Sequence, residues 1–202
     1  MSNERREKTR QHFIEVARKL ISERGRINVT MNDIATEAHM SRRTIYTYFA
    51  NCDEVYGAIL EYELTHLLQC LGVVMDMKLA PDKKLERFLL THLEAVKEAV
   101  THNNSLKNEF RRNLSAVERA RQTIDMQEIR MIRTLLIEGK NQGYFRIESP
   151  QWSAIVVFYS LKGLEAPYLN NTIGNYFRDN SASIFNLILE GILTDEHHTK
   201  HS

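Results

Sequence analysis

Arginine, hydroxyl and phenol side chains crowd into one short segment, Arg42 to Tyr48, in a pattern that suits a polyanion. Ile45 and Phe49 are four residues apart, so on a helix they would face the interior together. The polar residues off that inward stripe are Arg42, Arg43, Thr44, Thr47 and Tyr48, with Tyr46 at its flank. Guanidinium and hydroxyl groups hydrogen-bond to phosphate oxygens and base edges. The segment predicts a nucleic-acid-binding face, and a polar face that is merely solvated remains the alternative.

Two short helices must position this face, and each begins with a capping signal. Thr30 is followed three residues later by Asp33, which resembles a capping box with Asp in place of Glu. Ser41 is the N-cap of the second helix. Only residues 38–40 separate the two helices, and so short a connection cannot return the chain antiparallel. The spacing therefore predicts a helix-turn-helix.

Further helices are expected on both sides of this pair. An apolar stripe at helical spacing runs through residues 7–24 and ends at Gly25, a residue common just after a helix C-terminus. Asn51 and Glu54 begin a long helix that reaches about residue 77, before a break at Pro81. The later predicted helices cover residues 82–101, 105–113, 115–141, a segment that opens with Ser149-Pro150, and residues 172–193.

The composition supports an all-α chain of about nine helices. Among the 202 residues only 8 are Gly and 3 are Pro, which leaves little turn chemistry for short strands. An apolar fraction of 43% and a charged fraction of 26% describe a globular chain. We expect a cytoplasmic protein, because we find no secretory signal peptide and no run of about 18 apolar residues. Cys52 and Cys70 fit no metal or redox spacing, so we expect plain thiols.

Charge divides the chain unevenly. Residues 1–50 hold 10 Lys and Arg against 6 Asp and Glu, whereas the remainder holds 17 against 20. The positive potential that favours a polyanion is therefore concentrated in the first segment. We predict a helix-turn-helix domain over residues 1–50, comprising three helices, and a larger helical domain over residues 51–202.

Residues 13–60, and above all TMNDIATEAHMSRRTIYTYFANCDEV from Thr30 to Val55, resemble the N-terminal domain of the TetR family of bacterial transcriptional regulators. The resemblance implies an all-helical homodimer that places its third helix in the major groove of a palindromic DNA operator. It also implies a C-terminal domain that binds a small effector, and repression as the usual mode. The implied DNA contacts are Thr30, Ser41, Arg42, Arg43, Thr44, Tyr46, Thr47 and Tyr48.

Two positions depart from the family pattern. His39 stands where a turn glycine is usual, and His is among the residues that tolerate a positive φ. Cys52 stands where the family commonly has a lysine that binds phosphate. The basic residues near the N-terminus could supply the missing charge: Arg5, Arg6, Lys8 and Arg10.

A small-molecule site is expected among the middle helices, although each candidate residue also suits an ordinary core. The candidate lining residues are Tyr62, His66, Phe88, His92, Phe110, Met126 and Met131, with Met75 beside them. Their aromatic and Met content suggests an apolar or aromatic effector. His66, His92 and His102 lack metal-ligand spacing, so we expect no metal and no cofactor.

Dimerisation is predicted from the last two helices. Residues in the final helix alternate bulky and small side chains at steps of four and three, which lets a partner backbone approach. The predicted dimer interface comprises Trp152, Ile155, Val156, Tyr159, Phe177, Ser181, Ile184 and Ile188.

Two other classes of protein are alternatives to a regulator. An all-helical enzyme is disfavoured because the sequence has no nucleophile elbow, Walker loop or dinucleotide-binding turn. A scaffold whose helix-turn-helix binds protein stays open, and salt dependence separates the two, since DNA binding releases counterions. The preferred interpretation is a DNA-binding regulator, not an enzyme.

Overall fold

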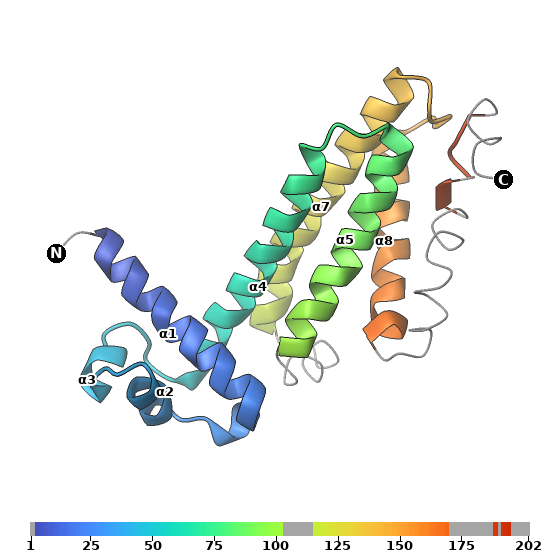
Figure 1. Cartoon of the computed structure of the whole chain (residues 1–202). Helices are drawn as coiled ribbons and strands as arrows, with labels where there is room; N and C mark the ends of the chain where they lie inside the picture. Colours follow the sequence, from blue (N-terminus) through green and yellow to red (C-terminus); the bar gives the residue numbers. More distant parts are fainter. Residues whose placement is uncertain (1–2, 103–114, 170–187, 190, 195–202) are drawn as a thin grey trace. The chain divides into compact units, whose positions relative to one another are not determined.

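The computed structural model describes residues 3–102, 115–169, 188–189 and 191–194. Over these residues the chain is helical, with one isolated bridge between Phe145 and Leu193 and no strand. The elements, labelled as in Figure 1, are α1 (Asn3–Arg24), the 3-10 helix η1 (Arg26–Asn28), α2 (Met31–Glu37), α3 (Arg42–Ile45), α4 (Cys52–Met75), α5 (Pro81–His102), α7 (Ser115–Asn141) and α8 (Pro150–Leu169).

The predicted all-α class is confirmed, with seven α-helices in the described residues rather than about nine. The predicted helix at 105–113 lies outside the described residues, as does most of the one at 172–193. The chain divides into two compact units, Met1–Thr65 with Glu98–Arg121 and His66–Lys97 with Gln122–Ser202, and α4 contributes residues to both.

Unit 1 contains the first three helices, in which α1 contacts α2 and α2 contacts α3. Helix α1 begins at Asn3, earlier than the predicted residue 7, and Lys8 pairs with Glu4 one turn away at 2.9 Å. Gly25 ends α1 with a φ of 78°, as its position predicted. The buried face of α1 is the predicted stripe of Phe13, Ile14, Ala17, Leu20 and Ile21.

The turn between α2 and α3 follows the prediction, including its unusual residue. His39 has a φ of 54°, the left-handed conformation that glycine adopts more easily. The backbone N–H of Met40 donates to Ala35 O at 2.9 Å and closes the turn. Helix α3 is shorter than predicted, because after Ile45 the chain tightens into turns in which Thr47 N donates to Thr44 O at 3.0 Å.

Helix α4 begins at the predicted place through a reciprocal cap. Asn51 Oδ1 accepts from the N–H of Glu54 at 2.9 Å, and Glu54 Oε2 accepts from the N–H of Ala50 at 2.7 Å. By length and composition α4 is apolar enough to cross a membrane, alone in this respect among the described helices, whereas the sequence led us to expect none. A core helix meets the same criterion, and Leu67 and Leu71 of α4 lie in a buried core.

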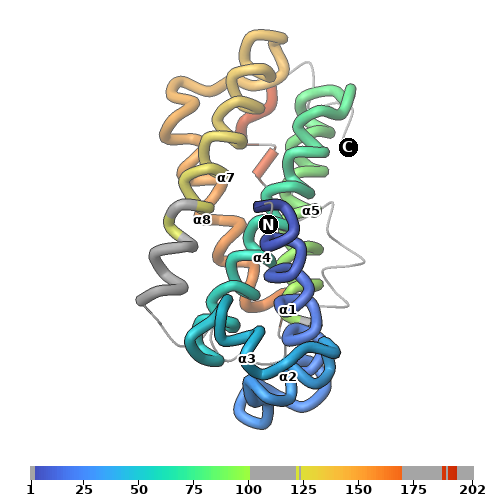
Figure 2. Tube along the Cα trace, turned by 90° about the vertical axis from the view of Figure 1, so that its left-hand side faces the viewer, coloured from blue at the N-terminus to red at the C-terminus, as the bar shows by residue number. Residues whose placement is uncertain are grey.

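Unit 2 is a helical bundle that comprises α8, most of α5 and α7, and the later part of α4, which run side by side in both views (Figures 1 and 2). Its core includes Leu71 of α4, Phe88 of α5, Leu135 of α7 and Phe158 of α8, all fully buried. Leu189 belongs to this core, and Ile192 packs against it. The bundle holds ionisable groups as well as apolar ones.

Candidate nucleic-acid interface

A hollow of about 670 Å³ in unit 1 separates the start of α1 from α3 and the turns after it. It brings together five of the eight predicted DNA contacts: Ser41, Arg43, Thr44, Thr47 and Tyr48. From α1 it adds Asn3, Arg5, Arg6 and Thr9. Within the part of the chain that the structure describes, none of Arg5, Arg6 and Arg43 forms an ion pair. Three unpaired guanidinium groups thus surround one hollow and can bind phosphate oxygens.

The basic residues near the N-terminus separate into two groups. Arg5 and Arg6 line the hollow, whereas Lys8 pairs with Glu4 and Arg10 lies 5.4 Å from the centre of the Phe49 ring. The sequence suggested all four as substitutes for the usual lysine. Only the first pair lies with α3, and it lies there because α1 is helical from Asn3 onward.

The hydroxyl groups of the hollow are largely engaged with the protein itself. Thr47 Oγ1 donates to Thr44 O at 2.7 Å, which leaves it only an acceptor. Ser41 Oγ accepts from Thr44 N at 3.1 Å and lies 2.8 Å from Thr44 Oγ1, so one of the two hydroxyls donates to the other. The arginines are therefore the main hydrogen-bond donors of the hollow.

The two tyrosines were both expected to be exposed, with Tyr46 at the flank. Tyr46 is indeed exposed, and the Arg42 guanidinium lies 5.7 Å from its ring centre. Tyr48 is instead half-buried, with its ring 5.7 Å from that of Phe13. The contact with α1 fixes the Tyr48 ring on the core while the residue still lines the hollow.

Thr30, Arg42 and Tyr46 lie outside the hollow. Thr30 caps α2, where its hydroxyl accepts from Asp33 N at 3.2 Å and donates to Asp33 Oδ2 at 2.6 Å. These hydrogen bonds from Thr30 hold the pKa of Asp33 below its usual value. The capping box that the sequence predicted is confirmed, and it occupies the hydroxyl proton of Thr30.

Cys52 offers no cation at the position where a lysine is common. Its thiol lies 3.7 Å from Val29 O, and burial raises the pKa of the thiol above its usual value. Cys52 therefore stays a neutral thiol, and Asp53 beside it pairs with Arg26 at 2.7 Å. Arg5 and Arg6 of α1 instead bring positive charge to the hollow beside α3.

A second cluster of polar groups lies inside unit 2. His92 of α5 is fully buried, with Nδ1 2.7 Å from Glu128 Oε2 of α7 and Nε2 2.9 Å from Glu165 Oε1 of α8. Lys162 lies 2.7 Å from the same Glu165 oxygen and 3.5 Å from Asp125. Burial opposes the charged form of His92, but the hydrogen bonds and negative charge of both glutamates outweigh it and raise the pKa of His92.

The predicted effector-lining residues that the structure describes are divided between the two units. Phe88 and His92 are buried in unit 2, where Met131 and Met75 pack at the edge of the core. Tyr62 belongs to unit 1, under the Arg18 guanidinium at 5.6 Å. His66 lies 3.8 Å from Cys70, Met126 is half exposed, and Phe110 lies outside the described residues. As ligand contacts all of these stay predictions.

Glu128 and Glu165 are functional candidates that were not predicted from the sequence. Both occupy core-facing positions: Glu165 follows buried Phe158 and Leu161 at helical spacing, and Glu128 precedes buried Ile132 and Leu135. An acidic residue on the apolar stripe of a helix is the signal that could have indicated them. Among the described residues no group of three or more His, Cys, Asp or Glu side chains could hold a metal ion.

The predicted dimer residues on α8 form an exposed apolar stripe. Trp152, Val156 and Tyr159, one turn apart, are 69%, 64% and 65% exposed, and Ile155 is half-buried. Exposed aromatic and aliphatic groups in a row are unusual on a monomer surface. Of the residues in the final helix, Ile188 is half-buried, whereas Phe177, Ser181 and Ile184 lie outside the described residues.

Comparison with known proteins bears on the helix-turn-helix and on the fold. Residues 13–59 match the family model described as bacterial regulatory proteins, tetR family. The uncharacterised HTH-type transcriptional regulator YhgD of Bacillus subtilis strain 168 is 26% identical over 149 residues, which are 72% of this chain and 76% of that protein.

Two solved structures share the fold over most of the chain. A transcriptional regulator from Cytophaga hutchinsonii ATCC 33406 has a TM-score of 0.79 at 15% identity, with 90% of this chain and 97% of that one covered. A regulator from Saccharomonospora viridis in complex with choline has a TM-score of 0.71 at 19% identity, with 93% and 99% covered.

Proposed function

Since the chain belongs to the TetR family of bacterial transcriptional regulators, with a DNA-binding helix-turn-helix, we propose that it is a repressor released by a small-molecule effector. In this proposal a homodimer binds a palindromic operator in the cytoplasm. Residues 1–50 bind the DNA, and residues 51–202 bind the effector and form the dimer. Membership of a regulator family favours this function over catalysis.

One observation carries the DNA-binding part of the proposal. Arg5, Arg6 and Arg43 surround a single hollow without an ion pair among the described residues, and α3 presents Arg42 beside it. Uncompensated guanidinium groups on one surface attract a polyanion, and arginine binds phosphate and guanine in a bidentate manner. We assign phosphate contacts to the hollow and base contacts to Arg42 and Tyr46.

In a two-fold symmetric dimer, the distance between the two recognition helices determines whether the protein stays bound to DNA. The two N-terminal domains of a dimer can bind successive major-groove faces only if their recognition helices lie about 34–36 Å apart or at a multiple of that distance. Helix α4 contributes residues to both units, so an effector that displaces α4 in unit 2 would move the DNA-binding groups. Couplings of about 1–3 kcal/mol are typical of such linkage.

The effector is proposed to be a small molecule with an apolar or aromatic body. The structural relative from Saccharomonospora viridis, which binds choline, supports a small-molecule site in a protein of this fold. Phe88 and Phe158, both buried in unit 2, are large aromatic groups that such a body could contact.

The test begins with an operator selected from randomised duplex DNA. Binding of the full-length protein should give a palindromic consensus, and the logarithm of its affinity should fall linearly with the logarithm of salt concentration. Arg43→Ala should weaken binding about tenfold at every sequence, whereas Arg42→Ala should cost about 1–3 kcal/mol at the selected site alone.

Arg133→Ala provides the matched control, because Arg133 is exposed on α7 in unit 2 and changes the same charge. Equal losses for Arg43→Ala and Arg133→Ala would assign the effect to net charge and contradict the interface. Binding that is insensitive to salt would favour a protein-binding scaffold instead.

A further inference from the structure

The buried cluster of unit 2 has a fixed arrangement of hydrogen bonds. Both ring nitrogens of His92 face carboxylate oxygens, Nδ1 toward Glu128 and Nε2 toward Glu165. A neutral imidazole has a single N–H and could donate to only one of them. With both carboxyl groups ionised, the arrangement requires an imidazolium that donates to each.

The two glutamates differ in what else holds them. Glu165 also receives the Lys162 ammonium at 2.7 Å, so a second cation shares its charge. Glu128 is completely buried, and among the described residues its Oε1 has no hydrogen-bond partner. A buried carboxylate oxygen without a donor carries a large desolvation cost. Glu128 is therefore held at one oxygen and unsatisfied at the other.

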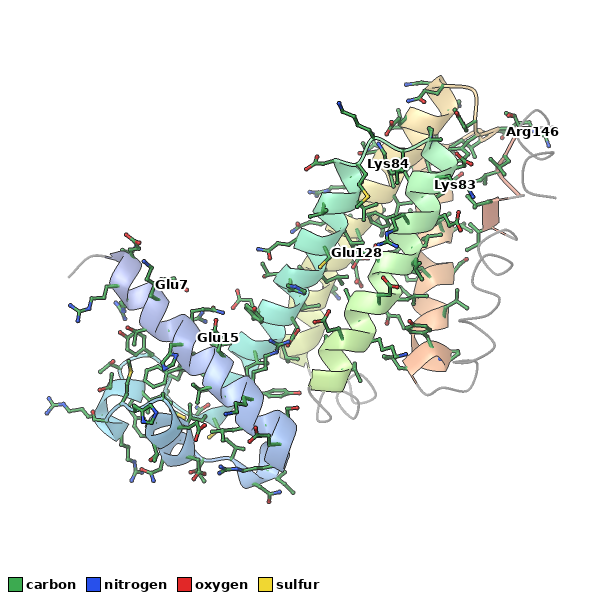
Figure 3. All side chains as sticks on the ribbon, viewed as in Figure 1. Glu7, Glu15, Lys83, Lys84, Glu128 and Arg146 are labelled. Atoms are coloured by element: carbon green, nitrogen blue, oxygen red, sulfur yellow. The ribbon has the colours of Figure 1, made fainter. Side chains whose placement is uncertain are left out.

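The unsatisfied oxygen lies inside the bundle rather than at its end. Figure 3 shows Glu128 among the helices of unit 2, and it stands midway along α7. Around it the core of this unit includes fully buried Phe88 and Phe158. A ligand that reached Glu128 would pack its apolar part against these rings and bring its polar end to the carboxylate.

The missing partner must be a donor, and a charged donor fits best. Hydrogen bonds between two ionised groups are shorter and stronger than neutral ones. The described residues provide no group that could hold a metal ion. An organic ammonium supplies the donor that Glu128 Oε1 lacks, and its positive charge strengthens the hydrogen bond to the carboxylate.

We propose that Glu128 anchors a protonated amine carried on an apolar or aromatic body, with His92 as the positioning residue that fixes the carboxylate. This amine is the effector class of the regulator, a step that rests on the proposed function. Glu165 and Lys162 complete the orientation of His92 and do not touch the ligand.

The test compares three probes that share a phenyl ring and differ in charge: 2-phenylethylammonium, 2-phenylethanol and phenylacetate. Each is titrated into the full-length protein by calorimetry up to about 10 mM, where weak binding is still measurable. The ammonium should bind at least about tenfold more tightly than the alcohol, as a charge-assisted hydrogen bond requires, and phenylacetate should bind worst.

Glu128→Gln keeps the shape of the side chain and removes its charge. It should lower the affinity for the ammonium at least about tenfold and leave the affinity for the alcohol unchanged. Glu94→Gln is the matched control, since Glu94 is exposed on α5, and should leave all three affinities unchanged. If Glu128→Gln does not fold, carbon-13 labelling of glutamate Cδ in the wild-type chain replaces it. The Glu128 resonance should then shift with the ammonium and not with the alcohol.

Equal affinity for the ammonium and the alcohol, or no binding of the ammonium, would overturn the proposal and leave Glu128 Oε1 to a buried water. Operator binding is measured separately in the same samples. An ammonium that binds at Glu128 without releasing the operator contradicts the effector-released repressor and leaves the amine site standing. An operator that never binds contradicts the DNA-binding function alone.

Discussion

The ring of Phe145 lies directly against the backbone of Gly139, so that a Cβ built at Gly139 would overlap Cδ2 and Cε2 of the ring. The N–H groups of Tyr144 and Phe145 both donate to Gly139 O, at 2.8 and 3.3 Å. The end of α7 and the loop after it therefore close onto one glycine, and Phe145 is buried as a result.

Gly139→Ala should destabilise the protein, although alanine normally favours a helix by about 1 kcal/mol over glycine. The added methyl group displaces a buried ring, and overpacking of this kind costs about 1–3 kcal/mol. Urea unfolding measures the difference. Gly57→Ala is the control, because nothing lies within 4 Å of a Cβ there, and it should stabilise the fold. Equal effects of the two substitutions would contradict the contact.

His92 should make the stability of the fold depend on pH. Its pKa is raised in the folded state above the ordinary value of 6.5, so its contribution is complete below that value and is lost as pH rises through the folded pKa. The free energy of unfolding should decline as pH rises above about 6.5, more steeply in the wild type than in His92→Gln. His12→Gln, at an exposed histidine, should keep the wild-type slope.

Thr30→Ala should act on folding more than on DNA. Loss of the N-cap should lower the free energy of unfolding by about 1 kcal/mol. The operator affinity of the folded protein should fall less than about threefold. The hydroxyl proton of Thr30 is already donated to Asp33 and is not available to phosphate. Thr36→Ala, an exposed threonine on the same helix, is the reference for both measurements. A tenfold loss of operator affinity in a stably folded Thr30→Ala protein would instead indicate a direct contact between Thr30 and DNA.

Val156→Glu should dissociate the proposed dimer without unfolding the protomer. A charge in the exposed stripe of Trp152, Val156 and Tyr159 would be desolvated in an interface, at a cost of about 2 kcal/mol or more. Sedimentation velocity should show the shift to monomer. Gln151→Glu introduces the same side chain on α8 away from that stripe and should remain dimeric. A monomeric wild type at micromolar concentration would contradict the interface itself.

Local rules were enough to predict the helix-turn-helix. The capping box at Thr30, the stop at Gly25 and the positive φ of His39 each depend on neighbours within a few residues, and each is confirmed. The buried positions Ile45 and Phe49 follow from spacing alone. These features could be predicted because a helix end or a tight turn is specified by a handful of adjacent side chains.

The polar partners could not be predicted, because they come from distant parts of the chain. His92 meets Glu128 and Glu165 across 36 and 73 residues. Arg5 and Arg6 join Arg43 only because α1 extends to Asn3 and brings its first turns to α3. Tyr48 was expected to be exposed because its spacing gives no indication of the ring of Phe13. Helical periodicity identifies which face is buried and not which neighbour it meets.

The hydroxyl pair of Ser41 and Thr44 has two equivalent proton arrangements, since either oxygen can be the donor to the other. A rotation of two hydroxyl hydrogens reverses the pair without moving a heavy atom. In the proposed complex the remaining proton can therefore be offered from either side chain, to an acceptor beside residue 41 or to one beside residue 44. Because the hollow is assigned to phosphate, this contact would tolerate small differences in the position of the DNA backbone from one operator to another, while base readout stays with Arg42 and Tyr46.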